Sequence, residues 1–233
     1  DMVYVGTGQL IGLPDLGTTQ TQTVYGVFDA PTNATYAEPS CTSSSGSPCT
    51  PLSRNSTQMI PQTLSYAGTI NGIGVRVVNP VNSVAIPKNG ATWNYGWYVD
   101  FNLISGERIV VNPQLESGGG LVVTSYIPNS SECVGGGTSW LQVFNYATGG
   151  GFTQPELDVS GQGINSSTNV INGLNPVGEA LGSVYASAAT LVNCNSTACG
   201  GGAKMNNLSN LTVKTVGDRG RLKKRIGWWE VRH

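Results

Sequence analysis

Short stretches in which hydrophobic and polar residues alternate recur along this chain of 233 residues. Alternation with a period of two, rich in β-branched and aromatic residues, is typical of strands with one buried face. Gly, Pro, Asn or Ser lies in nearly every gap between these stretches, as turns require. The pattern predicts strands over Met2–Gly6, Gln22–Asp29, Ile73–Asn79, Gly96–Asn102, Arg108–Gln114, Leu121–Ile127, Ser139–Tyr146 and Ile226–Arg232.

Helical periodicity is scarce. The one candidate helix runs from Glu179 to Val192, where Ala, Leu, Ser and Tyr favour a short helix while Gly182 opposes it. The sequence therefore predicts an all-β protein.

The most regular part of the chain is its middle. Arg108–Gln114, Leu121–Ile127 and Ser139–Tyr146 are three successive strands, and a turn over 145–149 closes the unit. An up-and-down antiparallel unit of this kind is the pattern of one propeller blade. Fewer than four such units are recognisable, whereas a propeller needs about 4–8 blades. We therefore expect residues 1–233 to form the C-terminal part of a β-propeller, with earlier blades upstream of residue 1.

Charge is low and unevenly distributed. Charged residues make up 11% of the chain, less than half of the ~25% in an ordinary soluble domain. Residues 219–233 hold six Lys or Arg and one Glu, a net charge of +5, so the remaining residues carry −6 of the total of −1. A basic tail can bind nucleic acid, but no stacking motif accompanies it and Ile226–Arg232 reads as a strand. We expect no nucleic-acid partner, and no apolar run approaches the roughly 20 residues of a membrane span.

Four of the five cysteines form two close pairs in segments rich in Ser, Thr, Gly and Asn, which read as surface loops. Cys41 pairs in sequence with Cys49, and Cys194 with Cys199. Their spacing is not that of zinc ribbons. Two disulfides, each stabilising by roughly 2–3 kcal/mol, are the better interpretation and indicate an oxidising, extracytoplasmic compartment. Cys133 is left over.

Ordered motifs along most of the chain carry a family resemblance. They are Val3–Gly8, Thr19–Asp29, Gln62-Thr63 leading to Arg76, Gly96–Phe101, Gly106–Pro113, Ser125–Pro128, Cys133, Thr138–Leu141 with Thr148–Gly150, Gly220-Arg221 and Gly227–Glu230. In this order they resemble the C-terminal part of the PilC/PilY family of type IV pilus tip-associated adhesins.

The resemblance implies a function as well as a fold. A member of this family is expected at the cell surface, on the pilus tip, with minor pilins, a host or abiotic surface and the remaining blades of the same protein as partners. It is expected to assist pilus assembly and mediate attachment. Two alternatives remain open: a secreted propeller enzyme, carbohydrate-active or quinoprotein-like, and a structural surface subunit.

One loop has the spacing of a calcium site. Counted from Asp158, the oxygen ligands of an EF-hand-type loop fall on Asp158, Ser160, Gln162, the Ile164 carbonyl, Ser166 and Asn169, with Gly163 at the turn. Relatives in the family often carry more acids here. Because this loop keeps one carboxylate, we expect weak calcium binding or none, and favour a loop held by its own side chains. No other cofactor is expected.

Catalysis finds little support in the residue types. The one histidine, His233, is terminal, so a catalytic triad cannot be built. Carboxylates such as Asp100, Glu107 and Glu116 are candidates for glycoside chemistry only if folding brings them together. The sequence therefore predicts a protein that is not an enzyme.

Overall fold

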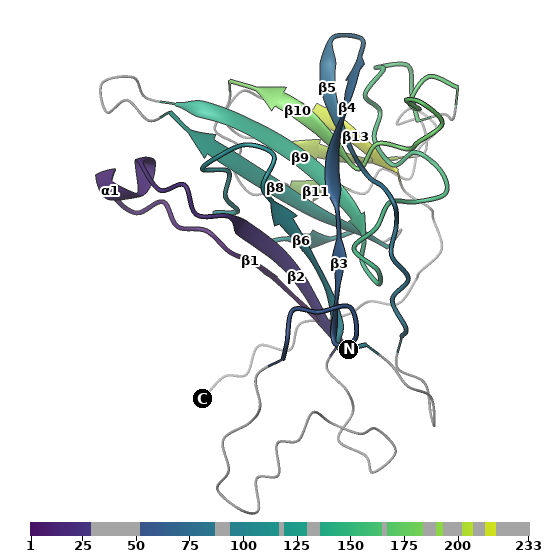
Figure 1. Ribbon diagram of the computed structural model, residues 1–233. Coiled ribbons are helices and arrows are strands. Elements are labelled where there is room, and N and C mark those ends of the chain that lie inside the picture. Colours follow the sequence, from purple (N-terminus) through teal and green to yellow (C-terminus); the bar gives the residue numbers. More distant parts are fainter. Residues whose placement is uncertain are drawn as a thin grey trace, which may run out of the picture.

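A computed structural model describes residues 1–28, 52–86, 94–116, 119–129, 136–164, 167–183, 190–192, 202–206 and 213–217. Within these residues the chain forms one short helix, α1 (Leu13–Leu16), and thirteen strands (Figure 1). The strands are β1 (Met2–Gly6), β2 (Gln22–Phe28), β3 (Met59–Gln62), β4 (Leu64–Ile70), β5 (Ile73–Val78), β6 (Gly96–Phe101), β7 (Gln114–Leu115), β8 (Gly120–Pro128), β9 (Gly137–Asn145), β10 (Gly178–Gly182), β11 (Thr190–Val192), β12 (Gly202–Asn206) and β13 (Val213–Gly217). The prediction of an all-β protein is confirmed.

Two of the three sheets carry most of the strands. Sheet A has the order β1-β2-β6-β3, and sheet B has the order β4-β5-β10-β9-β8-β7. The pair β3–β6 is parallel, whereas the other pairs in these sheets are antiparallel. The long strands β8 and β9 are neighbours in sheet B, and neither lies at its edge (Figure 1). A third, three-stranded sheet joins β11, β12 and β13.

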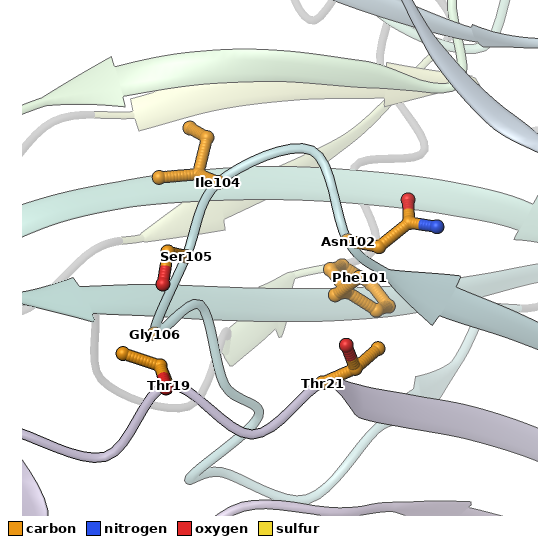
Figure 2. Close-up of a pocket in the computed structure, with 7 residues that line it drawn as sticks. All are labelled: Thr19, Thr21, Phe101, Asn102, Ile104, Ser105 and Gly106. Carbon is orange, nitrogen blue, oxygen red and sulfur yellow. The ribbon is translucent and has the colours of Figure 1, made fainter.

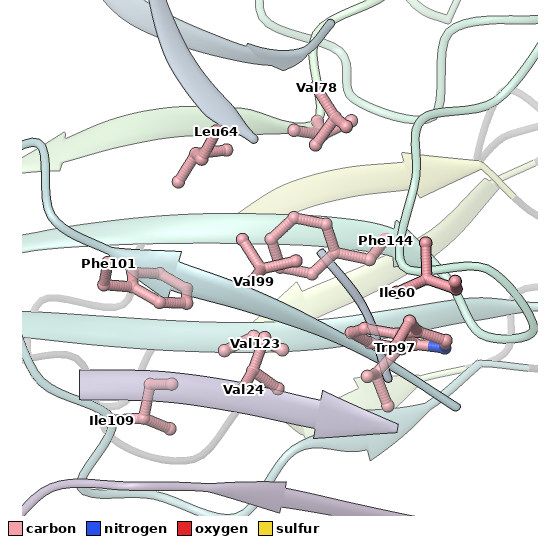
Figure 3. Packing of buried hydrophobic residues seen from close by; sticks show 12 residues of the cluster. Val24, Ile60, Leu64, Val78, Trp97, Val99, Phe101, Ile109, Val123 and Phe144 are labelled. Carbon is pink, nitrogen blue, oxygen red and sulfur yellow. The ribbon is translucent and has the colours of Figure 1, made fainter. Parts of the chain in front are cut away.

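The main hydrophobic core lies between sheets A and B. Sheet A contributes the inward-facing side chains of β2, β3 and β6, and sheet B those of β4, β5, β8 and β9 (Figure 3). The cluster consists of Val24, Ile60, Leu64, Val78, Trp97, Val99, Phe101, Ile109, Leu121, Val123, Phe144 and Val177. Its burial supplies the largest favourable term for the packing of the two sheets.

Trp97 joins the two sheets at this core. Its indole is fully buried, and Nε1 donates a hydrogen bond to the Tyr146 carbonyl at 3.0 Å, in the turn that follows β9. The backbones of Gly26 and Gly149 approach the indole so closely that a Cβ at either position would overlap it. Gly149 also has a φ of +68°, which L side chains rarely adopt. The turn over 145–149 therefore packs directly on the Trp97 indole, and Gly149 makes this close approach possible.

The outer face of sheet B is buried as well. Val75, Val122, Leu141 and Val143 form a second cluster with Leu157 and Val159, which come from the irregular segment after β9. This covering segment explains why β8 is buried along almost its whole length, whereas burial in β1 alternates.

Most predicted strands are present, with ends shifted by at most two residues. The expected strand over Arg108–Gln114 is wrong, because only Gln114–Leu115 forms β7 and Arg108 makes an isolated bridge to Tyr126. The backbone leaves the sheet here because the Ile109 N–H donates to the Thr7 carbonyl at 3.1 Å instead of to a ladder.

The candidate helix over Glu179–Val192 is also wrong. Gly178–Gly182 is the strand β10, which pairs with β5 and β9, and Thr190–Val192 is β11. Ladder partners on both sides of β10 outweigh the modest helix propensity of this segment. The expected strand over Ile226–Arg232 lies outside the described residues.

We expect Gly149→Ala to lower the free energy of unfolding by about 2–4 kcal/mol, because the methyl group overlaps the Trp97 indole and the positive φ is strained. Gly173→Ala is the matched control: its φ is +76° and no atom lies within 4 Å of the added Cβ. Strain alone should cost the control about 1–2 kcal/mol. Urea unfolding measures both, and equal losses would contradict a role for the indole contact.

Candidate functional site

A buried ion pair anchors the loop that follows β6. The Arg76 guanidinium, on β5, donates to both oxygens of Glu107, from NH1 at 2.6 Å and from NH2 at 2.8 Å. Both side chains are almost completely buried, at 1% and 0% exposure. Ser125 Oγ also donates to Glu107, and the Arg76 Cζ lies 3.8 Å from the centroid of the Trp140 ring. The Glu107 end of the loop is thereby tied to the inner face of sheet B.

Gln142 completes this polar cluster. Its surroundings favour the amide orientation in which the nitrogen donates to the Val123 carbonyl at 2.7 Å and the oxygen accepts from Arg76 NH1 at 3.1 Å. Breaking one partner of such a buried pair typically costs about 3–5 kcal/mol, because the other charge is left without compensation. The cluster is structural, since its groups use one another as partners.

The next residue, Arg108, binds a different part of the chain, the segment between β1 and β2. Its side chain is buried, and among the described residues the guanidinium donates to backbone carbonyls. The acceptors are Gly106 at 2.9 Å, Gln9 at 3.0 Å, Asp15 at 2.5 Å and Thr18 at 2.8 Å. Three of these carbonyls belong to the segment between β1 and β2, which contains α1. Arg108 therefore holds this segment against the loop after β6.

Asp15 fixes the same segment from within. Its carboxylate accepts hydrogen bonds from the backbone N–H groups of Ile11 at 2.7 Å and Gly12 at 3.0 Å, and from Gln9 Nε2 at 3.3 Å. The two backbone hydrogen bonds lower the pKa of the Asp15 carboxyl below its usual value. Asp15 is thus ionised at neutral pH.

Two hollows lie beside these clamped segments. The first, of about 210 Å³, is lined by Thr19, Thr21, Phe101, Asn102, Ile104, Ser105 and Gly106 (Figure 2). The second, of about 370 Å³, is lined by Gly8, Gln9, Asp15, Thr18, Gln20, Gln22 and Arg108. Hydroxyl and amide side chains predominate in both. Such groups are suited to hydrogen-bonding a neutral polar ligand.

Sequence reasoning did not find this arrangement. The one available signal was the adjacent pair Glu107-Arg108 in a chain with few charges. Its significance depends on the two side chains having different partners, Glu107 in sheet B and Arg108 in the segment between β1 and β2.

The loop predicted as a calcium site is held largely by its own groups. Asp158 accepts from the Gly163 N–H at 3.0 Å and from Ser160 Oγ at 3.2 Å. Asn169 is fully buried, accepts from the Ser160 N–H at 2.8 Å and donates to the Gly163 carbonyl at 2.8 Å. The Gln162 N–H donates to Ser160 Oγ at 3.2 Å. Asp158, Ser160 and Asn169 are thus brought together, whereas no hydrogen bond ties the Gln162 side chain or the Ile164 carbonyl to them. Ser166 lies outside the described residues.

The donor set of this loop does not fit a tight calcium site. Calcium affinity rises with the number of carboxylate ligands, and Asp158 is the one acid among the positions predicted to bind. Across the residues that the structure describes, no group of three or more His, Cys, Asp or Glu side chains is placed to hold a metal ion.

The other sequence candidates are separated. Asp100 lies on the outer face of sheet A, where it accepts from Thr23 Oγ1 at 2.6 Å and forms an ion pair with Arg54. Glu107 is buried against sheet B, and Glu116 lies beside the turn between β7 and β8. Asp100 and Glu107 therefore face different sides of sheet A. Cys41, Cys49, Cys133, Cys194 and Cys199 lie outside the described residues.

Comparisons with known proteins place the chain in context. No family model matches it. It is 29% identical over 175 residues to the type IV pilus biogenesis factor PilY1 of Pseudomonas aeruginosa, a match that covers 70% of this chain and 14% of that protein. It is also 29% identical over 182 residues to a PilY1 homologue of Xylella fastidiosa, which covers 75% of this chain and 12% of the homologue. The chain thus spans a small part of the curated relatives that it matches.

The fold agrees with these sequence matches. The crystal structure of the Pseudomonas aeruginosa PilY1 C-terminal domain superimposes with a TM-score of 0.65 and 24% sequence identity, and covers 93% of this chain and 41% of that chain. The predicted propeller architecture is confirmed by this likeness. No helix in the described part of the chain is long and apolar enough to cross a membrane. In sequence the chain is similar to the PilY1 type IV pilus biogenesis factors, and in fold it is similar to part of the PilY1 C-terminal domain.

Proposed function

We propose that this chain is the C-terminal propeller region of a type IV pilus biogenesis factor that acts outside the cell, at the pilus tip. The observation that carries the proposal is the agreement of sequence and fold with PilY1 over most of this chain. Its partners would be minor pilins and the host or abiotic surface to which the bacterium attaches.

The residues favour a protein that binds its partners and does not catalyse a reaction. Within the described residues, the carboxylates of Asp100 and Glu107 are engaged in ion pairs with arginines. A rigid β scaffold that carries polar connecting segments is suited to presenting a binding surface.

Deletion of the gene in the bacterium that encodes this chain should reduce both the number of surface pili and attachment to glass. Reintroduction of the intact gene should restore both, whereas a gene without the codons for residues 1–233 should fail to do so. Pili are counted by electron microscopy, and attachment is scored per pilus to separate assembly from adhesion. Normal pili and attachment in the deletion strain would refute the proposal.

We also propose that another blade of the same protein covers the outer face of sheet A. Val3 and Val5 on β1 are 53% and 48% exposed there, next to Val27 and Tyr25 on β2. Arg54 lies over the ring of Tyr98 at 4.2 Å from its centroid. The part of this face around Val3 and Val5 is apolar, whereas the Arg54–Asp100 ion pair lies elsewhere on it. An exposed apolar patch on a sheet is suited to packing against a neighbouring blade. The chain covers 41% of the PilY1 domain that it resembles, which leaves room for such a blade.

The double variant Val3→Glu/Val5→Glu tests this packing in the full-length protein. Burying two carboxylates under a blade is unfavourable, so we expect the melting temperature to fall by about 5 °C or more. Ile11→Glu is the control, because Ile11 is 86% exposed in the segment that carries α1. A double variant that melts with the wild type would show that no blade covers this face.

We further propose that the loop over residues 158–169 binds calcium no more tightly than millimolar. Its single acid, Asp158, already accepts two hydrogen bonds from within the loop. Isothermal titration of calcium should therefore give no constant below about 1 mM. A micromolar constant that is lost in Asp158→Ala would contradict this expectation.

A further inference from the structure

The segment Thr18–Gln22 separates the two hollows beside Arg108. Alternate residues line opposite sides: Thr19 and Thr21 line the first hollow, and Thr18, Gln20 and Gln22 line the second. Figure 2 shows Thr19 and Thr21 across the first hollow from the loop that carries Asn102 and Ser105. The segment is therefore a ridge with one polar hollow on each side.

The chemistry of the lining is neutral and rich in hydrogen-bonding groups. Residues with hydroxyl or amide side chains make up most of both linings: Thr19, Thr21, Asn102 and Ser105 in the first hollow, and Gln9, Thr18, Gln20 and Gln22 in the second. Gln9 Nε2 already donates to Asp15 and Gln22 Nε2 to the Gln20 carbonyl. An apolar ligand would still displace water from the remaining donors and acceptors of these side chains without replacing its hydrogen bonds, which is costly. The lining therefore selects a ligand with many neutral donors and acceptors of its own.

Asp15 and Arg108, the two charged residues that line the second hollow, also favour a neutral ligand over an anion. Arg108 directs its guanidinium to four backbone carbonyls, so it has little capacity left for an anion. Asp15 is ionised, which makes it a hydrogen-bond acceptor that attracts hydroxyl groups and repels anions. Hydroxyl groups, which donate and accept, suit this combination better than phosphate, sulfate or carboxylate.

The two ends of the ridge and the loop opposite it are held by hydrogen bonds: the Thr18 carbonyl accepts from Arg108, and Gln22 pairs with Phe101 at the start of β2. Glu107 and Arg108 tie the loop that carries Asn102 and Ser105 to sheet B and to the segment between β1 and β2. Arg108 and Asp15 fix that segment as far as the Thr18 carbonyl. Lining segments that are held in place before binding lower the entropy cost of binding, which matters for a ligand held by hydrogen bonds alone.

We propose that the ridge and its two hollows bind a neutral polysaccharide, with sugar units on both sides of Thr18–Gln22. Hollows of about 210 and 370 Å³ lie at or below the lower end of pockets for drug-sized ligands. They suit single sugar units of a longer chain. The chemistry of this proposal rests on the hollows, and its biological meaning rests on the proposed role in attachment. The sugar site and the attachment role can therefore be tested separately.

Isothermal titration of the full chain with soluble oligosaccharides tests the site. The probes are the hexasaccharides of cellulose, mannan, starch and chitin, with sulfated dextran oligomers as the anionic comparison. We expect at least one neutral probe to bind with a dissociation constant of about 1 mM or tighter, and the sulfated probe to bind more weakly. Binding of none of the neutral probes, or preference for the sulfated one, would overturn the proposal.

A pair of near-isosteric substitutions locates the binding. Thr21→Val/Asn102→Leu removes hydrogen-bonding groups from both sides of the first hollow and should weaken binding at least ~10-fold. Thr69→Val, on the exposed face of β4, is the matched control. Circular dichroism confirms that the variants are folded, and unchanged affinity in the double variant would overturn the assignment. Lost sugar binding with normal bacterial attachment would support the site and contradict its part in attachment.

Discussion

The arrangement of the connecting segments depends on two buried charged residues, Glu107 and Arg108, which are adjacent in sequence but bind different parts of the molecule. Glu107 forms an ion pair with Arg76 on the inner face of sheet B, while Arg108 donates to four backbone carbonyls, three of them in the segment between β1 and β2. Both arginines use the several N–H groups of their planar guanidinium. Arg76 binds the two oxygens of one carboxylate, and Arg108 binds several backbone carbonyls. Because buried charges are costly without partners, these contacts define where the connecting segments lie relative to the sheets.

The packing of sheet A on sheet B supplies the frame for these polar clamps. Trp97 reaches from sheet A to the turn after β9, and the glycines at 26 and 149 allow the backbone to approach its indole. Sheet B is covered on its outer face by Leu157 and Val159, whereas the outer face of sheet A leaves Val3 and Val5 exposed. This asymmetry is the physical basis for expecting a neighbouring blade on one side only, in agreement with the likeness to part of the PilY1 C-terminal domain.

The alternation of hydrophobic and polar residues predicted a strand correctly where that strand pairs with a neighbour on each side and has one buried face. β6 is the clearest example, since its inward residues Trp97, Val99 and Phe101 alternate with the partly exposed Tyr98 and Asp100. The same reasoning failed for Arg108–Gln114, where hydrogen bonds to distant segments replace the ladder, and for Glu179–Val192, where partners on β5 and β9 impose a strand. In the loop that begins at Asp158, the spacing indicated that Asp158, Ser160 and Asn169 lie together, because those contacts are local, but not that the Gln162 side chain and the Ile164 carbonyl lie apart from them.

The amino-acid sequence by itself determined the all-β class, the positions of most strands and the resemblance to pilus-associated proteins, because period-two alternation, turn residues and ordered motifs are local properties. Only the tertiary structure decided which partners Glu107 and Arg108 have, and that the threonines and glutamines of residues 18–22 line two hollows. Their roles arise from contacts with residues as far as 99 positions away in the chain. A charged or hydroxyl side chain has many acceptable partners in sequence, and the folded geometry selects among them.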